Sequence, residues 1–357
     1  MASQIHYFLG ANTKDGFCSF YQELYEDPRI KTVWIIKGGP GNGKSTFMRA
    51  LGETAEANGL KQEYILCSSD PDSLDGLVLP EVSLAVVDGT EPHVFEPQLC
   101  GLDARYIDFS SCYRDGMENI AQTLYGVRTE NKACYRPAYT CLSCAAALRQ
   151  EVYLSVRSQL PEDILLSIGE GMRQELRQGK QACIIKRFFT GFTPKGLQYR
   201  LDTPAALCDR LYILKDSYGL SSEILSALLY SALQNSLFCI AGMSPLDPTR
   251  YEQLILPELK IGILRSTQQT AYHGSSFCQI DLDALCEKHL PAQLKRHIPF
   301  LLCTANALTE EAITHLQEAK ALHDKLELLS RPYVDFSVAS CLRERYQEKL
   351  LERIRQM

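Results

Sequence analysis

The chain has 357 residues, of which 45% are hydrophobic and 22% charged, and its formal net charge is −6. These proportions are ordinary for a soluble globular protein with ample chain to bury a core. The acidic balance argues against nucleic acid or an anionic membrane surface as a partner. At roughly 150 residues per domain, the length predicts two domains.

The N-terminal residues 1–6 show neither the basic region nor the apolar stretch of a secretory signal. No run of about 18 apolar residues is present that could cross a membrane. Fourteen cysteines in such a chain predict reduced thiols rather than disulfides. We therefore expect a cytoplasmic protein without membrane contact.

Apolar runs and helical patterns alternate along the first half, which predicts a parallel sheet covered by helices. Gly59 is placed to end one helix as its C′ residue, and residues 68–76 are rich in turn formers. In chain order, the expected elements are a helix over 17–26, a strand over 33–37, a helix over 44–58, and strands over 64–67, 84–88 and 105–109. They are followed by a helical stretch over 143–177 broken near Pro161, a strand over 183–186, and helices at about 309–329 and 335–356.

The strand over 33–37 runs into a glycine-rich turn that opens into a helical pattern. Gly38, Gly43, Lys44 and Ser45 match G-x-x-x-x-G-K-[ST], the P-loop pattern, between the strand and the helix that it requires. Backbone N–H groups of such a loop close around phosphate oxygens, the lysine reaches the β- and γ-phosphates, and the hydroxyl ligates Mg²⁺. The sequence therefore predicts a nucleotide triphosphate site. The residues expected to contact the nucleotide are Gly38, Gly39, Pro40, Gly41, Asn42, Gly43, Lys44, Ser45 and Thr46.

Asp88 ends the apolar strand over 84–88, the position of a Walker-B-type Mg²⁺ ligand. An acid in this position can instead cap a loop. Together with Ser45, Asp88 would hold the metal, and together with Lys44 it would belong to the catalytic group. Glu91, three residues later, is the candidate general base, and a solvated loop acid is the alternative.

The chain contains an internal duplication. Residues 34–37 recur in character at 212–215, 77–82 at 254–259 and 84–87 at 261–264, with an offset of about 174 to 181 residues throughout. Such a fixed period indicates a repeat. We predict two tandem domains, residues 1–180 and 181–357, each with a parallel sheet and each ending in a helical pair.

In the second copy the phosphate loop is degenerate. In the sequence comparison Ser222 replaces Lys44, Glu223 replaces Ser45 and Arg265 replaces Asp88. A loop without the lysine and with added acids would repel a triphosphate. We therefore predict one nucleotide site per chain, in the first half. Because the positions of two metal ligands have become an acid and a base, we also predict a salt bridge between Glu223 and Arg265.

These features resemble the P-loop NTPase superfamily. The whole chain is similar to an uncharacterised family of bacterial tandem P-loop ATP-binding proteins, in which the motifs around residues 10–16, the P-loop, residues 68–75 and residues 79–81 recur. The resemblance implies two tandem P-loop NTPase-like domains and ATP with Mg²⁺ as ligands. It leaves the biological role open.

Three functions fit this reading. The first is an ATPase with one active site. The second is a kinase that phosphorylates a small molecule held between the halves, and the third is a non-catalytic nucleotide-dependent scaffold or sensor for a protein partner. ATPases of the additional-strand type usually carry a glutamate directly after the Walker-B aspartate, whereas this chain has Gly89. Candidate charge stabilisers for the transferred phosphoryl group are Arg105, Arg114 and Arg128.

Cys134, Cys141 and Cys144 raise the question of a structural metal. A structural zinc needs four ligands, and no well-spaced fourth is evident. The favoured reading is an apolar helix that contains these cysteines.

Overall fold

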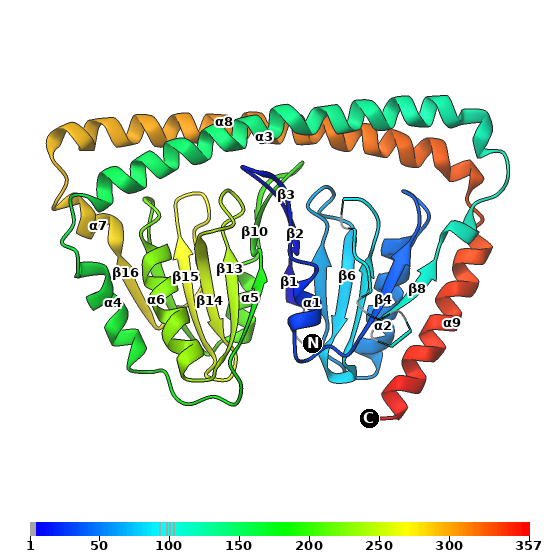
Figure 1. The fold of residues 1–357 in the computed structure, drawn as a ribbon, viewed down its shortest axis with the longest axis horizontal. Coiled ribbons are helices and arrows are strands. Elements are labelled where there is room, and N and C mark those ends of the chain that lie inside the picture. The colour runs from blue at the N-terminus through cyan, green and yellow to red at the C-terminus, as the bar shows by residue number, and fades with distance from the viewer. Residues whose placement is uncertain (1–4, 93, 98, 100, 103) are drawn as a thin grey trace.

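The protein is an α/β molecule with two similar halves (Figure 1). The structure, a computed structural model, describes residues 5–92, 94–97, 99, 101–102 and 104–357. Two six-stranded sheets lie side by side beneath a pair of long helices. Among the helices of these residues, none is long and apolar enough to cross a membrane.

The first sheet has the strand order β1-β5-β6-β7-β4-β8 and is mixed, not parallel as expected. β6 pairs antiparallel with both of its neighbours, and the other pairs are parallel. The reason is connection length, because the loop before β6 and the short 3₁₀ turn Pro80–Val82 after it are too short for a parallel crossover. The strands are β1 Ile5–Tyr7, β4 Thr32–Lys37, β5 Glu63–Leu66, β6 Leu74–Leu79, β7 Leu84–Asp88 and β8 Ala104–Asp108.

The second sheet repeats this arrangement. Its order, β9-β13-β14-β15-β12-β16, matches the first sheet strand for strand, and β14 is again the antiparallel member. The strands are β9 Cys183–Arg187, β12 Arg210–Lys215, β13 Phe238–Met243, β14 Tyr251–Leu256, β15 Ile261–Ser266 and β16 Cys278–Asp281.

Each half also carries a β-hairpin, which corrects the helix expected over 17–26. β2 (Gly10–Thr13) pairs with β3 (Gly16–Ser19), and only Glu23–Glu26 are helical, as α1. Gly16 has φ +107°, which lets the chain reverse over two residues and start a strand instead of a helix. β10 (Thr190–Thr193) and β11 (Gly196–Tyr199) form the matching hairpin.

The two long helices connect the halves. α3 (Ala121–Arg157) and α8 (Ala292–Ser330) run antiparallel along each other above both sheets (Figure 1). Both are longer than expected, because small and apolar side chains pack between their central parts. These side chains include Ala138, Leu142 and Ala145 of α3 and Ala305, Ala312 and Leu316 of α8.

The helices that follow this pair pack on the opposite half of the chain. α4 (Ile164–Arg173) contributes Leu165 and Met172 to the core of the second sheet, beside α6 (Ser221–Gln234). α9 (Phe336–Arg355) packs on α2 (Lys44–Ala57) of the first half. The boundary between the two repeats, near residue 180, is therefore not a boundary between two separately packed cores. A helix from each repeat packs on the sheet of the other repeat. The short helices α5 (Asp202–Leu207) and α7 (Leu282–Glu287) belong to the second half.

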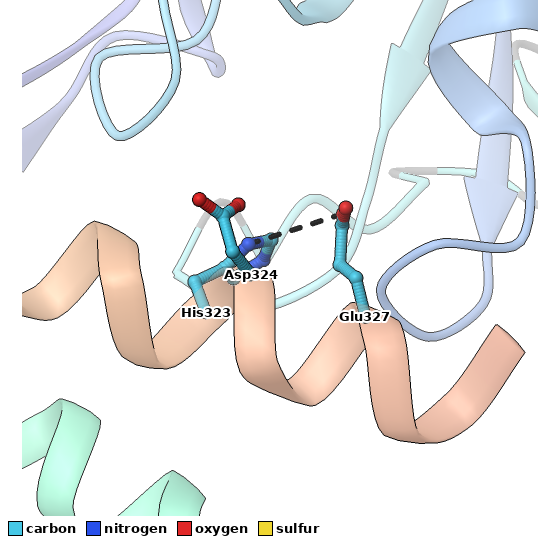
Figure 2. A group of neighbouring side chains, drawn as sticks. All are labelled: His323, Asp324 and Glu327. Carbon is cyan, nitrogen blue, oxygen red and sulfur yellow. Dashed lines mark ion pairs between the residues drawn. The ribbon is translucent and has the colours of Figure 1, made fainter.

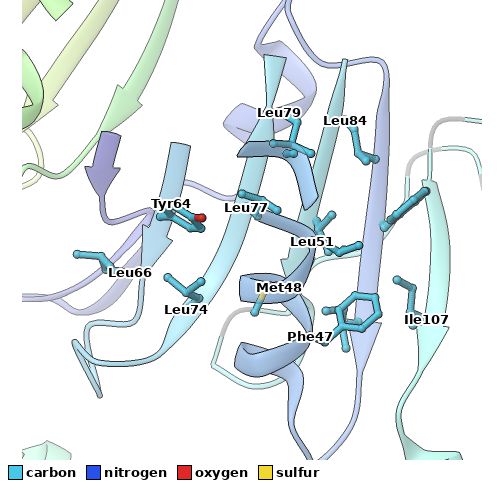
Figure 3. Packing of buried hydrophobic residues seen from close by; sticks show 14 of the residues in the cluster. Phe47, Met48, Leu51, Tyr64, Leu66, Leu74, Leu77, Leu79, Leu84 and Ile107 are labelled. Carbon is cyan, nitrogen blue, oxygen red and sulfur yellow. The ribbon is translucent and has the colours of Figure 1, made fainter. Parts of the chain in front are cut away.

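One face of the first sheet forms a dense core with α2 (Figure 3). Phe47, Met48 and Leu51 of α2 are almost fully buried against strand side chains such as Leu77. Tyr346 of α9 meets the ring of Phe47 at 5.8 Å in an edge-on contact. As expected, the C′ residue after α2 is the glycine at position 59, with φ +77°. This packing fixes the start of α2 beneath the glycine-rich turn.

Buried charges join the two halves. Arg187 of β9, 2% exposed, lies 3.0 Å from the carboxylate of Glu63 of β5, and Arg29 contacts the same carboxylate at 2.7 Å. Burial raises the pKa of Glu63, but the two guanidinium groups, Arg187 first, lower it more, so that the pKa is about 2. Nearby, the backbones of Phe8 and Phe188 exchange two hydrogen bonds of 2.9 Å.

Candidate functional site

The glycine-rich turn lies at the carboxyl end of β4 and leads into α2. Gly41 and Gly43 have φ +73° and +94°, values that L side chains rarely adopt. At Gly38 there is no room for a Cβ, which would lie 2.8 Å from the Cβ of Phe109. The turn therefore keeps a bare backbone at the start of a 14-residue helix, as phosphate binding requires.

Asn42 braces this turn from inside. It is 1% exposed, and with its amide oriented to satisfy both groups it donates to the carbonyl of Gly39 at 3.0 Å and accepts from the N–H of Gly39 at 3.2 Å. The carbonyl of Pro40 accepts a hydrogen bond from the Tyr113 hydroxyl at 3.3 Å. Thr46, in the first turn of α2, is exposed. The predicted nucleotide-contact residues thus form the turn and the first residues of α2.

Lys44 folds back over the loop. Its Nζ donates to the carbonyls of Gly38 and Gly39 at 3.1 and 2.6 Å and lies 3.6 Å from Oδ2 of Asp88. The strands β4 and β7 are direct neighbours in the sheet, so their carboxyl ends bring the lysine and the acid together. The structure therefore brings together two of the three predicted catalytic residues.

Asp88 is 9% exposed and uses only one of its oxygens for the local turn. Its Oδ1 accepts from the backbone N–H of Thr90 at 2.9 Å and from the Thr90 hydroxyl at 2.6 Å. Its Oδ2 faces Lys44. The residue is thus a loop cap and at the same time offers a carboxylate oxygen to the site.

Ser45 accepts a hydrogen bond from the backbone N–H of Leu74 at 3.0 Å. In the second half, Ser222 accepts the same bond from Tyr251, also at 3.0 Å. Because α2 begins at Lys44 and α6 at Ser221, the structural equivalents are Lys44 with Ser221 and Ser45 with Ser222. The replacement of Ser45 by Glu223 inferred from the sequence is therefore wrong by one residue, and the serine is retained.

Glu91 is paired with two cations of α3. Its carboxylate, half exposed, pairs with Lys132 at 2.8 Å and with Arg128. Hydrogen bonds from these two cations, Lys132 first, lower the pKa of Glu91, which makes it a weaker proton acceptor. Its role as general base remains a prediction. Of the three arginines considered as charge stabilisers, Arg128 is thus engaged with Glu91, and Arg114 pairs with Asp335 at 3.2 Å.

A helix from the second half lies against the glycine-rich turn, which sequence reasoning missed. A Cβ at Gly41 would lie 3.3 Å from the Cβ of Glu327 of α8. Figure 2 shows Glu327 with His323 and Asp324 on this part of α8. The imidazole of His323 lies 3.9 Å from the Glu327 carboxylate, and one donor atom of each of the three residues lies within 4.8 Å of the others.

The cysteines considered as metal ligands all lie on α3 as free thiols. Cys134 and Cys141 are partly buried and Cys144 is exposed. Within the described part of the chain they belong to no group of three or more residues with clustered metal-binding atoms. Burial raises the pKa of Cys134 and Cys141, which disfavours the thiolate that a metal needs.

In the second half, a side chain of the protein itself occupies the loop that corresponds to the glycine-rich turn. The carboxylate of Asp216, 0% exposed, accepts hydrogen bonds of 2.7–3.0 Å from the backbone N–H groups of Tyr218, Gly219 and Ser221. These are donors that a P-loop would offer to phosphate. The internal carboxylate therefore occupies the place of an anionic ligand.

The predicted salt bridge between Glu223 and Arg265 is wrong. Arg265 pairs instead with Glu252 at 2.9 Å and with Asp216 at 3.6 Å. Glu223 accepts from Arg157 of α3 at 3.0 Å and from the hydroxyl of Tyr153 at 2.8 Å. The prediction fails because Glu223 lies one position farther along α6 than the sequence comparison assumed, so that it faces α3.

Comparisons with known protein families, with curated proteins and with solved structures gave no match to this chain.

Proposed function

We propose that the first half of the chain binds ATP with Mg²⁺ and hydrolyses it, and that the second half is a P-loop-like domain without a nucleotide site. The observation that carries this proposal is the position of Lys44, on the loop carbonyls and 3.6 Å from Asp88, at the start of α2. A lysine, an acid and bare backbone converging at a helix N-terminus favour a bound polyphosphate.

The residues present fit a magnesium ion. Asp88 has a carboxylate oxygen outside its local turn, and the hydroxyl of Ser45 has a second lone pair beyond the one used by Leu74. Oxygen donors of this kind are what Mg²⁺ prefers, with the remaining positions taken by phosphate oxygens and water. Bound with the nucleotide, the ion would neutralise charge on the β- and γ-phosphates.

The groups of the chain would then act as follows. The amine of Lys44 exchanges the carbonyls of Gly38 and Gly39 for the β- and γ-phosphates, where it stabilises the charge that develops during transfer. The backbone N–H groups of the loop and of the first turn of α2 hold the phosphates in place. Gly89 follows Asp88, so the strand end itself supplies no second carboxylate to orient water. This arrangement favours slow hydrolysis.

The contact between the loop and α8 favours a nucleotide-dependent switch as the second candidate. The backbone of Glu327 lies beside Gly41, so a rearrangement of the loop on nucleotide binding would act directly on α8. Because α8 pairs with α3 across both halves, a shift there would reach the whole molecule. A kinase with a small-molecule acceptor remains the third candidate.

Phosphate release by the purified protein separates these functions. The native protein should release phosphate from ATP in the presence of Mg²⁺ without an added acceptor, and Lys44→Ala should abolish both release and binding. Nucleotide binding without release would favour the switch, and release only with an acceptor would favour the kinase. Undiminished binding by Lys44→Ala would contradict all three.

A further inference from the structure

A small cavity in the second half lies between the degenerate loop and α3. Its volume is about 60 Å³, and its wall includes Arg149 and Tyr153 of α3, Ser221 at the start of α6, and Arg250 and Arg265 from the second sheet and its loops. This volume is the space open to the centre of a water-sized sphere, of which one water needs about 10–15 Å³, so the cavity has room for a small ion.

Arg149 brings a positive charge to this wall without a partner of opposite charge. Its Nη2 donates to the amide oxygens of Asn306 at 2.7 Å and Gln269 at 3.3 Å. Within the described part of the chain, no carboxylate lies within 4.0 Å of its guanidinium. Burial, followed by the nearby charge of Arg265, lowers the pKa of Arg149 to about 10. A cation that is partly withdrawn from water and has no carboxylate partner gains free energy from an anion that reaches it.

Arg250 is the second cation of the cavity that has no acidic partner among the described residues. Its Nη2 donates to the carbonyl of Gly219 at 2.6 Å, and its guanidinium stacks over the ring of Tyr153 at 4.1 Å. The acids on the same wall are already paired, Glu252 with Arg265 at 2.9 Å and Asp247 with Lys14 at 3.1 Å. The cavity thus has an excess of positive charge.

Ser221 provides an independent sign of a ligand. It is 1% exposed and lines the cavity at the first residue of α6, yet its Oγ has no hydrogen-bond partner. Buried polar atoms are almost always hydrogen-bonded, and an orphan calls for an unseen partner. Ser221, Arg149 and Arg250 line the same cavity, and neither arginine has a carboxylate partner among the described residues.

We propose that this cavity binds a small oxyanion such as inorganic phosphate, held by the guanidinium groups of Arg149 and Arg250 and by the hydroxyl of Ser221. Arginine donors match the spacing of oxyanion oxygens, and a hydroxyl donates one further bond. This inference is independent of the proposed ATP site, because it concerns the half whose loop is filled by Asp216. Since α3 carries Arg149, the anion would join that helix to the second sheet.

The experiment is a calorimetric titration of the full-length Lys44→Ala protein with sodium phosphate at constant ionic strength. This background removes the lysine of the first site. We expect saturable binding at one site, and Arg149→Met in the same background should weaken it about tenfold or more, because a hydrogen-bonded charge is lost. Arg173→Met, which changes an exposed arginine of α4 paired with Glu170, is the matched control and should leave phosphate binding unchanged.

Absence of saturable heat, or equal affinity with and without Arg149, would overturn the proposal. If Arg149→Met does not fold, Arg250→Met and Ser221→Ala replace it; each should weaken binding several-fold, and unchanged affinity in both would overturn the proposal. ATP should give no heat in the Lys44→Ala protein, and tight binding of ATP there would show that the second half accepts a nucleotide and would overturn the proposal. The result does not depend on whether the first half hydrolyses ATP.

Discussion

Replacing Ser45 or Ser222 by alanine removes an equivalent hydrogen bond from each half. In each case it is the 3.0 Å bond from the N–H of the first residue of the antiparallel strand, β6 or β14, to the serine hydroxyl. A neutral hydrogen bond contributes about 0.5–1.5 kcal/mol, and a buried N–H left without a partner costs about 1–3 kcal/mol. Both variants should therefore lose a similar free energy of unfolding in urea, about 1–3 kcal/mol in the absence of nucleotide. A purely structural serine would show no other effect.

The variants should differ once Mg²⁺ and ATP are present. Calorimetry should show weaker Mg²⁺-dependent ATP binding for Ser45→Ala and unchanged binding for Ser222→Ala. With EDTA, Ser45→Ala and the native protein should bind ATP alike, because the difference lies in the metal. If Ser222→Ala weakens ATP binding as much as Ser45→Ala, or if Ser45→Ala leaves the Mg²⁺ dependence intact, the assignment of Ser45 as a metal ligand is refuted.

Three further results are expected. Asp88→Asn should weaken Mg²⁺-dependent binding far more than it lowers the melting temperature of the nucleotide-free protein; equal losses would leave Asp88 as a loop cap only. Asp216→Ala should lower the free energy of unfolding in urea by about 1.5–3 kcal/mol or more, since three backbone N–H groups lose a charged acceptor, and a loss below about 1 kcal/mol would contradict the filled loop. The pKa of Glu63 is about 2 in the folded protein against an ordinary 4.5, so ionised Glu63 stabilises the fold above pH 4.5 and this contribution is lost as the pH falls toward 2. Glu63→Gln should therefore lose less stability than the native protein over that range, and parallel pH curves would contradict this account.

Local signals in the sequence were sufficient for the elements around the first site. The apolar run, the glycines and the helical pattern predicted β4, the turn and α2, and Gly59 marked the end of that helix. Each of these features depends on residues close in sequence. The position of Asp88 beside Lys44 was also predictable, because neighbouring strands bring their carboxyl ends together.

Features that depend on distant contacts were not predictable in this way. The first part of α3 contains Gly126 and Pro137, which disfavour a helix, and α8 stabilises it only through packing along the shared length. The exchange of α4 and α9 between the halves follows from the course of these long helices, which no local pattern encodes. For the same reason the contact of Glu327 with Gly41 could not be foreseen.

The loop after β12 in the second half could be predicted from the sequence only in part. The comparison of the two halves correctly identified the loss of the lysine. It was one residue out of register, however, and so paired Ser45 with Glu223 where the structure pairs Ser45 with Ser222. The filling of the loop by Asp216 is visible only from hydrogen bonds to successive N–H groups. An aspartate directly after the strand was the available signal, and its orientation toward the loop required the structure.

The most direct test of the central claim is the number of nucleotides bound per chain. Calorimetric titration of the native protein with a non-hydrolysable ATP analogue and Mg²⁺ should give one site, and the same titration of Lys44→Ala should give none. Two sites per chain would show that the loop filled by Asp216 still binds nucleotide. No binding by the native protein would contradict the assignment of the Lys44 loop as a nucleotide site.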